Sequence, residues 1–327
     1  MAQRRQPRRV GVEIPGADVQ GVLGDIREAE SLGIQAVWLT TGGPRTADNN
    51  IRRDTPSILA AAAMCTETIQ LGTAIVLTWP RHPLSFVEYG EAMAQLAPGR
   101  FRLGLGPGNK APIERTYGFA FERPLGHLTE YVQIVRAVLR EGGVNFNGRF
   151  YRAQTADNVP VDVPVLISAV RPKSFELAGA STDGAISWLC PGAYLRDHAV
   201  PLMAAGAEKA GQPTPPLIAH VAVSLHDDWN EVEAVARERF DSYMRRDPYV
   251  EMYRIAGFAE AEQRAWSTPM LRSLVVSGDE AEAERRLLEL FSFGAAEIMV
   301  SVLPAGNDPE SSRRRTLEFL GKFARTL

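Results

Sequence analysis

One local pattern recurs along the chain: an amphipathic helix, a glycine, and then a short apolar strand. Glycine adopts the left-handed backbone conformation without steric cost, so it ends a helix and lets the next strand begin at once. Strands that alternate with helices in this way predict βαβ units and a parallel sheet. The pattern occupies 19–40, 84–106, 173–188 and 280–302, with its glycines at Gly33, Gly99, Gly184 and Gly294.

Eight strands are expected in total. They are 9–14, 36–40, 69–76, 101–106, 165–169, 185–188, 217–225 and 297–302. Most are continuously apolar, as strands buried on both faces are. Eight strands with helices between them predict a closed (β/α)8 TIM barrel of the α/β class. A doubly wound open sheet is the alternative, but no GxGxxG motif follows the first strand, which disfavours it.

The length of the chain, 327 residues, exceeds the roughly 250 residues of a plain barrel. No shift of composition marks a domain boundary, so we expect one barrel domain over 1–327 with insertions at about 107–164 and 241–272. The first holds a predicted helix, 125–140, and an alternating octet, 144–151, that predicts a hairpin around an Asn-Gly turn. Long loops at the C-terminal ends of barrel strands form active sites, so both insertions are expected to shape a substrate pocket.

Charge and composition exclude several classes of protein. The net charge of −3 and the pI of about 6.0 offer no basic surface for nucleic acid. Cys65 and Cys190 form no CxxC motif, which suits a reducing compartment. No apolar run is long enough to cross a membrane, and the arginine-rich start lacks the apolar core of a signal peptide. We therefore expect a cytoplasmic protein with a small-molecule substrate and no nucleic-acid or membrane partner.

The first strand ends with an acidic residue, Glu13, among apolar neighbours. Burial disfavours the charged form of a carboxylate, which suits a group that exchanges a proton near neutral pH. A structural ion pair with an arginine of a neighbouring strand, for instance Arg102, is the alternative.

Other strand ends carry glycine and small polar residues that leave room for a ligand. Thr40 and Thr41 precede Gly42-Gly43 after the second strand, Gly72 lies inside the third strand, and Gly104, Gly106 and Gly108 alternate before Asn109. After the fifth strand, Ser168, Ala169, Val170 and Arg171 lead into a helix whose first N–H groups could bind a phosphate. Ordinary turns, helix caps and solvated helix starts are the alternatives.

Several common reaction types lack support. No HExxH, GxSxG, P-loop or EF-hand pattern occurs, and the five histidines (82, 127, 198, 220 and 226) are scattered. Metal-dependent hydrolysis and hydrolytic triads are therefore disfavoured. Arg81 and His82 fall at the start of a helix, where they either bind an anion or lie in solvent.

An ordered set of segments resembles the luciferase-like flavin and deazaflavin oxidoreductases. The segments are LGIQAVW at 32–38, LGT at 71–73, PRHP at 80–83, GRFRLGLGPG at 99–108, FNGRFY at 146–151, AG and TDG within 178–184, and VSGD at 276–279. Within this superfamily GVEI at 11–14 and GLGPGNK at 104–110 are most similar to the branch that uses the 8-hydroxy-5-deazaflavin coenzyme F-420, the branch of methylenetetrahydromethanopterin reductase.

The resemblance implies a (β/α)8 barrel with a deazaflavin across its mouth and hydride transfer at the ring. It implies a catalytic role for Glu13 and a cis peptide bond between Ala74 and Ile75 beneath the ring. It also implies a phosphate site at Ser168, Ala169, Val170 and Arg171, and we include Thr41, Gly106 and Asn109 among the cofactor-binding residues. A homodimer is expected on the same ground.

The chain departs from its relatives at informative positions. Thr41 and Gly42 stand where many relatives have Asp and His, Asn109 stands where sugar-phosphate dehydrogenases of the branch have an acid, and Val170-Arg171 stands where Gly-Gly is common. A sugar-phosphate dehydrogenase is thus disfavoured. An FMN-dependent monooxygenase that uses oxygen and a non-catalytic flavin-binding protein are the alternatives to an F-420-dependent oxidoreductase.

Overall fold

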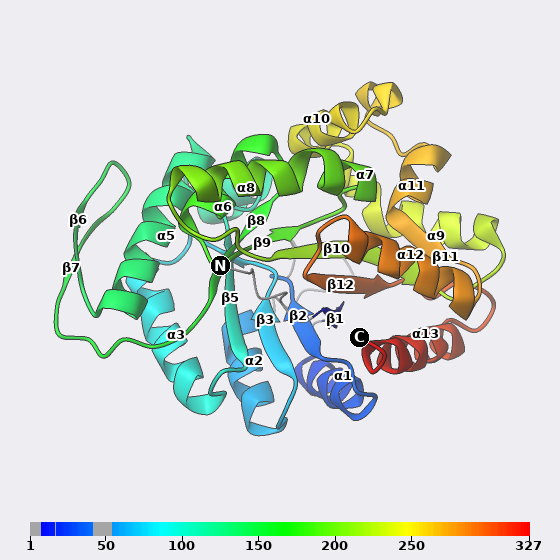
Figure 1. Ribbon diagram of the computed structural model, residues 1–327, viewed down its shortest axis with the longest axis horizontal. Helices are drawn as coiled ribbons and strands as arrows, with labels where there is room; N and C mark the ends of the chain where they lie inside the picture. Colours follow the sequence, from blue (N-terminus) through cyan, green and yellow to red (C-terminus); the bar gives the residue numbers. More distant parts are fainter. Residues whose placement is uncertain (1–7, 17, 42–53) are drawn as a thin grey trace.

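The computed structural model describes residues 8–16, 18–41 and 54–327. In these parts of the chain eight parallel strands close into a barrel, in the order β1, β2, β3, β5, β8, β9, β10, β12 (Figure 1). Closure rests on β10, which pairs with both β9 and β12, and on β12, which also pairs with β1. An open sheet would leave two free edges, so the predicted (β/α)8 barrel is confirmed and the open-sheet alternative is wrong.

The barrel strands agree closely with the eight predicted runs. They are β1 (Arg9–Glu13), β2 (Ala36–Leu39), β3 (Gln70–Thr73), β5 (Phe101–Gly106), β8 (Val165–Ala169), β9 (Gly184–Ser187), β10 (Leu217–Ser224) and β12 (Glu297–Val302). The predicted third strand is divided, because β3 ends at Thr73 and a short strand, β4 (Val76–Leu77), then pairs with β5. The peptide bond between Ala74 and Ile75 in this break is cis, as the family resemblance implied.

Helices surround the strands on the outside of the barrel (Figure 1). They include α1 (Val19–Ser31), α2 (Thr55–Met64), α3 (Pro83–Leu96), α6 (Pro172–Ser181), α7 (Gly192–Tyr194), α8 (Val200–Lys209), α12 (Glu280–Ser292) and α13 (Pro309–Ala324), and η2 (Leu195–Ala199) joins α7 to α8. Gly33, Gly99 and Gly294 have φ of 85°, 68° and 103°, as predicted for residues that follow a helix. Gly184 is different: it is the first residue of β9, and α6 ends at Ser181 with an extended C-cap residue, Thr182, in place of a left-handed one.

A buried ion pair lies at the N-terminal end of the barrel. Arg102 of β5 donates to both carboxylate oxygens of Glu297 of β12, at 2.5 and 3.1 Å. The indole Nε1 of Trp38 donates to the same carboxylate at 2.7 Å, and the Arg102 guanidinium lies 4.3 Å from the Trp38 ring centre. These three side chains fill the interior next to the small apolar cluster of Leu166, Ile186, Ile218 and Met299.

The segment 107–164 holds α4 (Lys110–Pro112), η1 (Ile113–Tyr117), α5 (Pro124–Glu141) and a hairpin of β6 (Val144–Asn147) and β7 (Arg152–Thr155). The hairpin projects from the barrel (Figure 1), but its predicted turn is wrong. The loop spans 148–151, because the Glu130 carboxylate accepts the N–H groups of Arg149, Phe150 and Tyr151 at 2.8–3.1 Å. This contact replaces a tight two-residue turn.

The segment 241–272 follows α9 (Trp229–Phe240) and is helical. It holds η3 (Asp241–Tyr243), α10 (Asp247–Ile255), η4 (Ala259–Gln263) and α11 (Thr268–Leu274), and β11 (Val275–Ser277) then pairs with the end of β10. Among the described residues, no helix is long and apolar enough to cross a membrane.

Candidate active site

Glu13 lies at the C-terminal end of β1, and only 5% of the residue is exposed. Nη2 of Arg239, on α9, lies 3.0 Å from its Oε1 and 3.1 Å from its Oε2. Ser301 of β12 donates its hydroxyl to Oε2 in a short hydrogen bond, and the hydroxyl of Thr40 lies 3.4 Å from Oε1. The carboxylate of Glu13 is therefore buried among hydrogen-bond donors. The apolar neighbours of Glu13 in the sequence had suggested apolar surroundings instead.

The alternative interpretation of Glu13 was an ion pair with an arginine such as Arg102, and that partner is wrong. Arg102 binds Glu297 at the opposite end of the barrel, so it does not pair with Glu13. The ion pair of Glu13 is instead made by Arg239, which comes from outside the barrel strands and whose side chain is 43% exposed. The Glu13 carboxylate is thus buried beneath the half-exposed guanidinium of Arg239 at the barrel mouth.

Four of the predicted cofactor-binding residues lie against one another, and one of them, Thr41, directly follows the Thr40 that contacts Glu13. The N–H and the hydroxyl of Thr41 donate to the carbonyl of Ile75 at 3.2 and 2.5 Å. A Cβ added to Gly106 would lie 2.6 Å from the Ser168 hydroxyl and 2.7 Å from Ile75 Cγ1. Thr41, Ile75, Gly106 and Ser168 thus line one continuous surface, on which a side chain at residue 106 has no room because Ser168 and Ile75 occupy the space.

Other glycines noted in the strands serve the packing of the protein itself. A Cβ at Gly72 would overlap the Trp38 ring, and one at Gly104 would overlap the carbonyl of Thr73. Gly108 has a φ of 70° and packs against Leu77. The expectation that Gly72, Gly104 and Gly106 leave space for a ligand is therefore wrong, because neighbouring protein atoms occupy that space.

The predicted phosphate loop is held by its own contacts. The N–H of Val170 donates to the Ser174 hydroxyl at 3.2 Å, and its carbonyl accepts from the Tyr194 hydroxyl at 2.9 Å. Arg171 is the N-cap of α6 and pairs with Glu251 of α10 at 3.3 Å. Ala169 is buried at the end of β8. The N–H of Val170 is thus already used within the protein, whereas the half-exposed Arg171 links the loop to the second insertion.

The remaining predicted residues have different surroundings. Asn109 is the N-cap of α4, and its side chain makes no capping hydrogen bond there. Arg81 pairs with Asp54 at 2.5 Å, and Nδ1 of His82 accepts the Leu84 N–H at the start of α3. Both are therefore engaged in structural contacts. Gly42 and Gly43 lie outside the described residues.

Sequence reasoning missed three residues around Glu13: Arg239, Ser301 and His220. His220 lies in β10 and is buried, with its Nε2 2.8 Å from the Ser301 hydroxyl. Burial, with a smaller effect from nearby Arg239, lowers its pKa from 6.5 to about 3. The available signal was a histidine inside LIAHVAVS and a serine inside EIMVSV, since polar residues within buried strands need partners.

Trp188 and two residues of the second insertion, Tyr243 and Arg246, form an aromatic and basic wall next to this group. The rings of Trp188, after β9, and Tyr243, in η3, are 6.3 Å apart. The guanidinium of Arg246 lies 4.4 Å from the centre of the Tyr243 ring. Burial raises the pKa of the Tyr243 phenol, and the charge of Glu13 acts in the same direction. The second insertion thus contributes side chains next to Glu13, as expected for a segment that shapes a pocket.

A second buried histidine belongs to the first insertion. His127 of α5 stacks on Trp79 with ring centres 3.7 Å apart, and its Nε2 lies 2.7 Å from the Tyr151 hydroxyl. Burial lowers the pKa of His127 from 6.5 to about 4. The ring is therefore neutral at physiological pH and joins the segment after β4 to the hairpin loop.

This lowered pKa predicts how stability depends on pH. Between pH 6.5 and about 4 the unfolded chain binds a proton at residue 127 that the folded chain does not. Stability at this site is therefore complete above pH 6.5 and falls as the pH drops, by on the order of 3 kcal/mol. Urea unfolding between pH 4 and 7.5 should show a shallower loss for His127→Gln than for the wild type. His198→Gln, at a partly exposed position, is the control, and an unchanged slope in His127→Gln contradicts the prediction.

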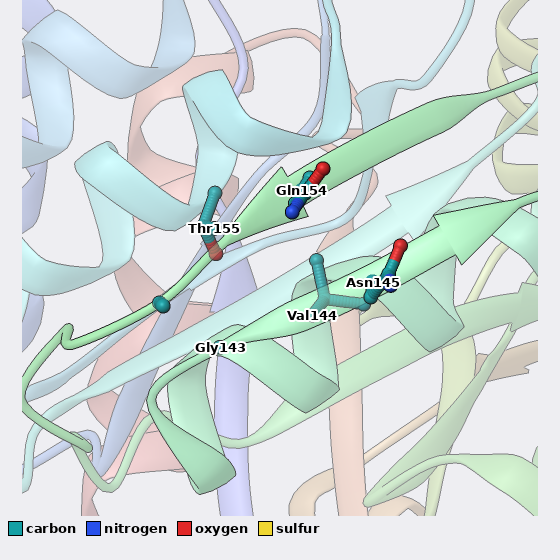
Figure 2. A pocket seen from close by; sticks show the side chains of 6 residues that line it. Gly143, Val144, Asn145, Gln154 and Thr155 are labelled. Atoms are coloured by element: carbon teal, nitrogen blue, oxygen red, sulfur yellow. The ribbon is translucent and has the colours of Figure 1, made fainter.

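Two cavities lie away from this site, one at the hairpin and one of about 370 Å³ at the N-terminal end of the barrel beside Arg102 and Glu297. Within the described ranges no group of His, Cys, Asp or Glu side chains could hold a metal ion. A hollow of about 640 Å³ lies at the hairpin, lined by Val144, Asn145, Gln154 and Thr155 and their neighbours (Figure 2). None of its lining residues comes from a barrel strand, so it is separate from the strand ends that carry Glu13.

Comparison with known proteins places the chain in a family. The family model described as luciferase-like monooxygenase matches residues 5–319. The chain belongs to the luciferase-like monooxygenase family. The resemblance inferred from the sequence segments is thereby confirmed.

Members of the luciferase-like family with assigned activities include two kinds of relative. The 5,10-methylenetetrahydromethanopterin reductase of Methanolobus tindarius is 26% identical, over 95% of this chain and 98% of the reductase. The F-420-dependent glucose-6-phosphate dehydrogenase of Nocardia farcinica is 32% identical, over 56% of this chain and 57% of the dehydrogenase.

Solved structures of the luciferase-like type share the fold. An F-420-dependent secondary alcohol dehydrogenase, in complex with an F-420–acetone adduct, has a TM-score of 0.79 at 16% identity and covers 97% of this chain and 98% of its own. The coenzyme F-420-dependent tetrahydromethanopterin reductase from Methanopyrus kandleri has a TM-score of 0.73 at 22% identity and covers 98% and 99%.

Proposed function

We propose that this chain transfers a hydride between bound coenzyme F-420 and a small organic substrate, and that Glu13 exchanges the accompanying proton. The observation that supports this most directly is the connection at Thr40-Thr41. Thr40 contacts the Glu13 carboxylate, and Thr41 is bonded to Ile75 on the surface predicted to hold the coenzyme. The relatives named above, a reductase and F-420-dependent dehydrogenases, support the same class of reaction.

The residues present suit a flat ring with a phosphate-bearing tail. The ring would lie beside Thr41, Ala74, Ile75, Gly106 and Asn109, because Thr41 and Gly106 both lie against Ile75. The tail phosphate would lie near Ser168, Ala169, Val170 and Arg171. When bound, the deazaflavin accepts or supplies a hydride at its ring, and the protein orients it.

In the oxidative direction the bound coenzyme would accept a hydride, two electrons and one hydrogen, from a carbon atom of the substrate. The remaining proton leaves its oxygen or nitrogen for Glu13, and a C=O or C=N bond forms. In the reductive direction Glu13 returns that proton. Arg239 stabilises the ionised carboxylate between these steps, and Trp188 and Tyr243 form the substrate wall. Asn109 stands where the sugar-phosphate dehydrogenases of the branch have an acid, so we propose a different substrate. We also propose that the protein is a homodimer. The molar mass measured by light scattering tests this.

Cofactor titration of the purified apo-protein tests the proposal. Fluorescence titration is expected to give saturable binding of F-420 and much weaker binding of FMN. Tight FMN binding with none of F-420 would reverse the assignment in favour of a flavin monooxygenase. Bound F-420 without hydride exchange over a panel of alcohols, aldehydes and imines would support a non-catalytic binding protein.

Gly106→Ala is expected to weaken F-420 binding by about tenfold or more. The added methyl must displace the Ser168 hydroxyl or the Ile75 side chain, and overpacking of this kind costs about 1–3 kcal/mol. Gly24→Ala on α1 is the matched control, since a Cβ there has nothing within 4 Å. Equal affinity in the two variants would remove Gly106 from the coenzyme site.

A further inference from the structure

A chain of hydrogen bonds of defined direction ends on Glu13. The N–H of Leu189 donates to Nδ1 of His220 at 3.3 Å, so Nδ1 carries a lone pair and the ring proton is on Nε2. Nε2 then donates to the Ser301 hydroxyl at 2.8 Å, which leaves the hydroxyl hydrogen for Oε2 of Glu13. Each donor in this series of hydrogen bonds thus has one acceptor, and donation proceeds from the N–H of Leu189 toward the Glu13 carboxylate.

We infer that His220 and Ser301 are positioning residues for Glu13: they hold Oε2 as a permanent acceptor and leave Oε1 as the atom that gains and loses the proton. The inference rests on the proposed function of Glu13 and assigns to one of its oxygens the proton exchange proposed above. Neither residue touches the substrate in this arrangement, because both act through the carboxylate.

The two oxygens of the Glu13 carboxylate accept hydrogen bonds of different length. Oε2 accepts from both Ser301 and Arg239, which uses the two lone pairs of that oxygen. Oε1 accepts from Arg239 at 3.0 Å, but its second contact, the Thr40 hydroxyl, is at 3.4 Å. A proton on Oε2 must displace the short Ser301 bond, whereas a proton on Oε1 displaces only the long one. Oε1 is also the oxygen beside Thr40, next to the predicted coenzyme surface.

The titratable and charged groups that face Glu13 are compatible with proton exchange at Oε1 and not at Oε2. Arg239 comes from α9, Tyr243 from η3 with Arg246 behind its ring, and His220 from β10. His220 stays neutral because burial keeps its pKa near 3, so it does not compete for the proton. Its ring is clamped by stacking on Trp188 at 3.9 Å and by the edge of Phe240 at 6.3 Å.

Infrared difference spectroscopy during a pH titration tests the inference without coenzyme or substrate. The protonated-carboxyl band that Glu13→Gln removes belongs to Glu13. In Ser301→Ala the ionised carboxylate loses one donor, so the midpoint of this band is expected to move up by about one pH unit. His220→Leu should produce a similar shift, because Ser301 is then free to turn away. His220→Gln should restore the wild-type midpoint, since its amide nitrogen can donate from the position of Nε2.

A purely structural role predicts a different pattern. All three variants would then unfold at lower urea concentration while the carboxyl midpoint stays at the wild-type pH, and that result would overturn the inference. Nitrogen-15 NMR of His220 gives a second check that needs no variant. The neutral ring with the proton on Nε2 is expected from pH 5 to 9, and a charged ring or a proton on Nδ1 contradicts the chain. Failure of the proposed function appears separately, as absent F-420 binding or as full activity of Glu13→Gln.

Discussion

Glu13→Gln is expected to slow single-turnover hydride transfer by about 10²- to 10⁴-fold, the range typical for loss of a positioned proton donor or acceptor. The amide keeps the size of the side chain and still accepts the Ser301 hydroxyl, but it cannot gain and lose the proton. F-420 affinity should change little, because Glu13 lies next to the predicted coenzyme surface and not within it. The rate is followed by the deazaflavin absorbance, with the substrate that the wild type converts fastest in the panel.

Glu88→Gln, on the exposed face of α3, is the matched control and should react at the wild-type rate. An unimpaired single-turnover rate in Glu13→Gln excludes the proton role of Glu13. A slow rate that accompanies a comparable loss of F-420 binding instead makes Glu13 part of the coenzyme site.

Arg102→Met is expected to destabilise the fold by about 3–5 kcal/mol, because it leaves the carboxylate of Glu297 buried without its counter-ion. Glu297 is 3% exposed, and only the indole of Trp38 would remain as a donor to it. Methionine retains most of the volume of arginine, so the loss reports the charge more than a cavity. The measurement is the urea midpoint at pH 7, with the m-value checked for an unchanged transition.

Two further variants separate charge from packing in this pair. Arg102→Met with Glu297→Gln should recover much of the lost stability, since no charge is then buried and the Trp38 indole keeps an acceptor. Arg245→Met breaks an exposed pair with Asp241, four residues earlier in the chain, and should cost under about 1 kcal/mol. A single Arg102→Met variant as stable as Arg245→Met would show that the ion pair does not stabilise the barrel.

Local sequence signals were sufficient for most of the fold. Continuous apolar runs separated by amphipathic helices and glycines located all eight barrel strands to within a few residues. They failed where a distant side chain decided the local geometry. The turn at Asn147-Gly148 was mispredicted because Glu130 binds three consecutive N–H groups beyond it, and Gly184 was misread because the strand begins at that residue.

In the candidate site, too, some residues could be found from local sequence patterns and others only from the structure. The sequence by itself determined the barrel, its family, Glu13 at a strand end, and the small residues Thr41, Gly106 and Ser168 at neighbouring strand ends. The tertiary structure decided the partners of Glu13, because Arg239 and Ser301 lie 226 and 288 residues away along the chain. Barrel closure brings β12 beside β1, with Val12 opposite Val300, and so brings Ser301 and the adjacent His220 to the carboxylate. No local period encodes such a contact, since it arises from the register between the first and last strands.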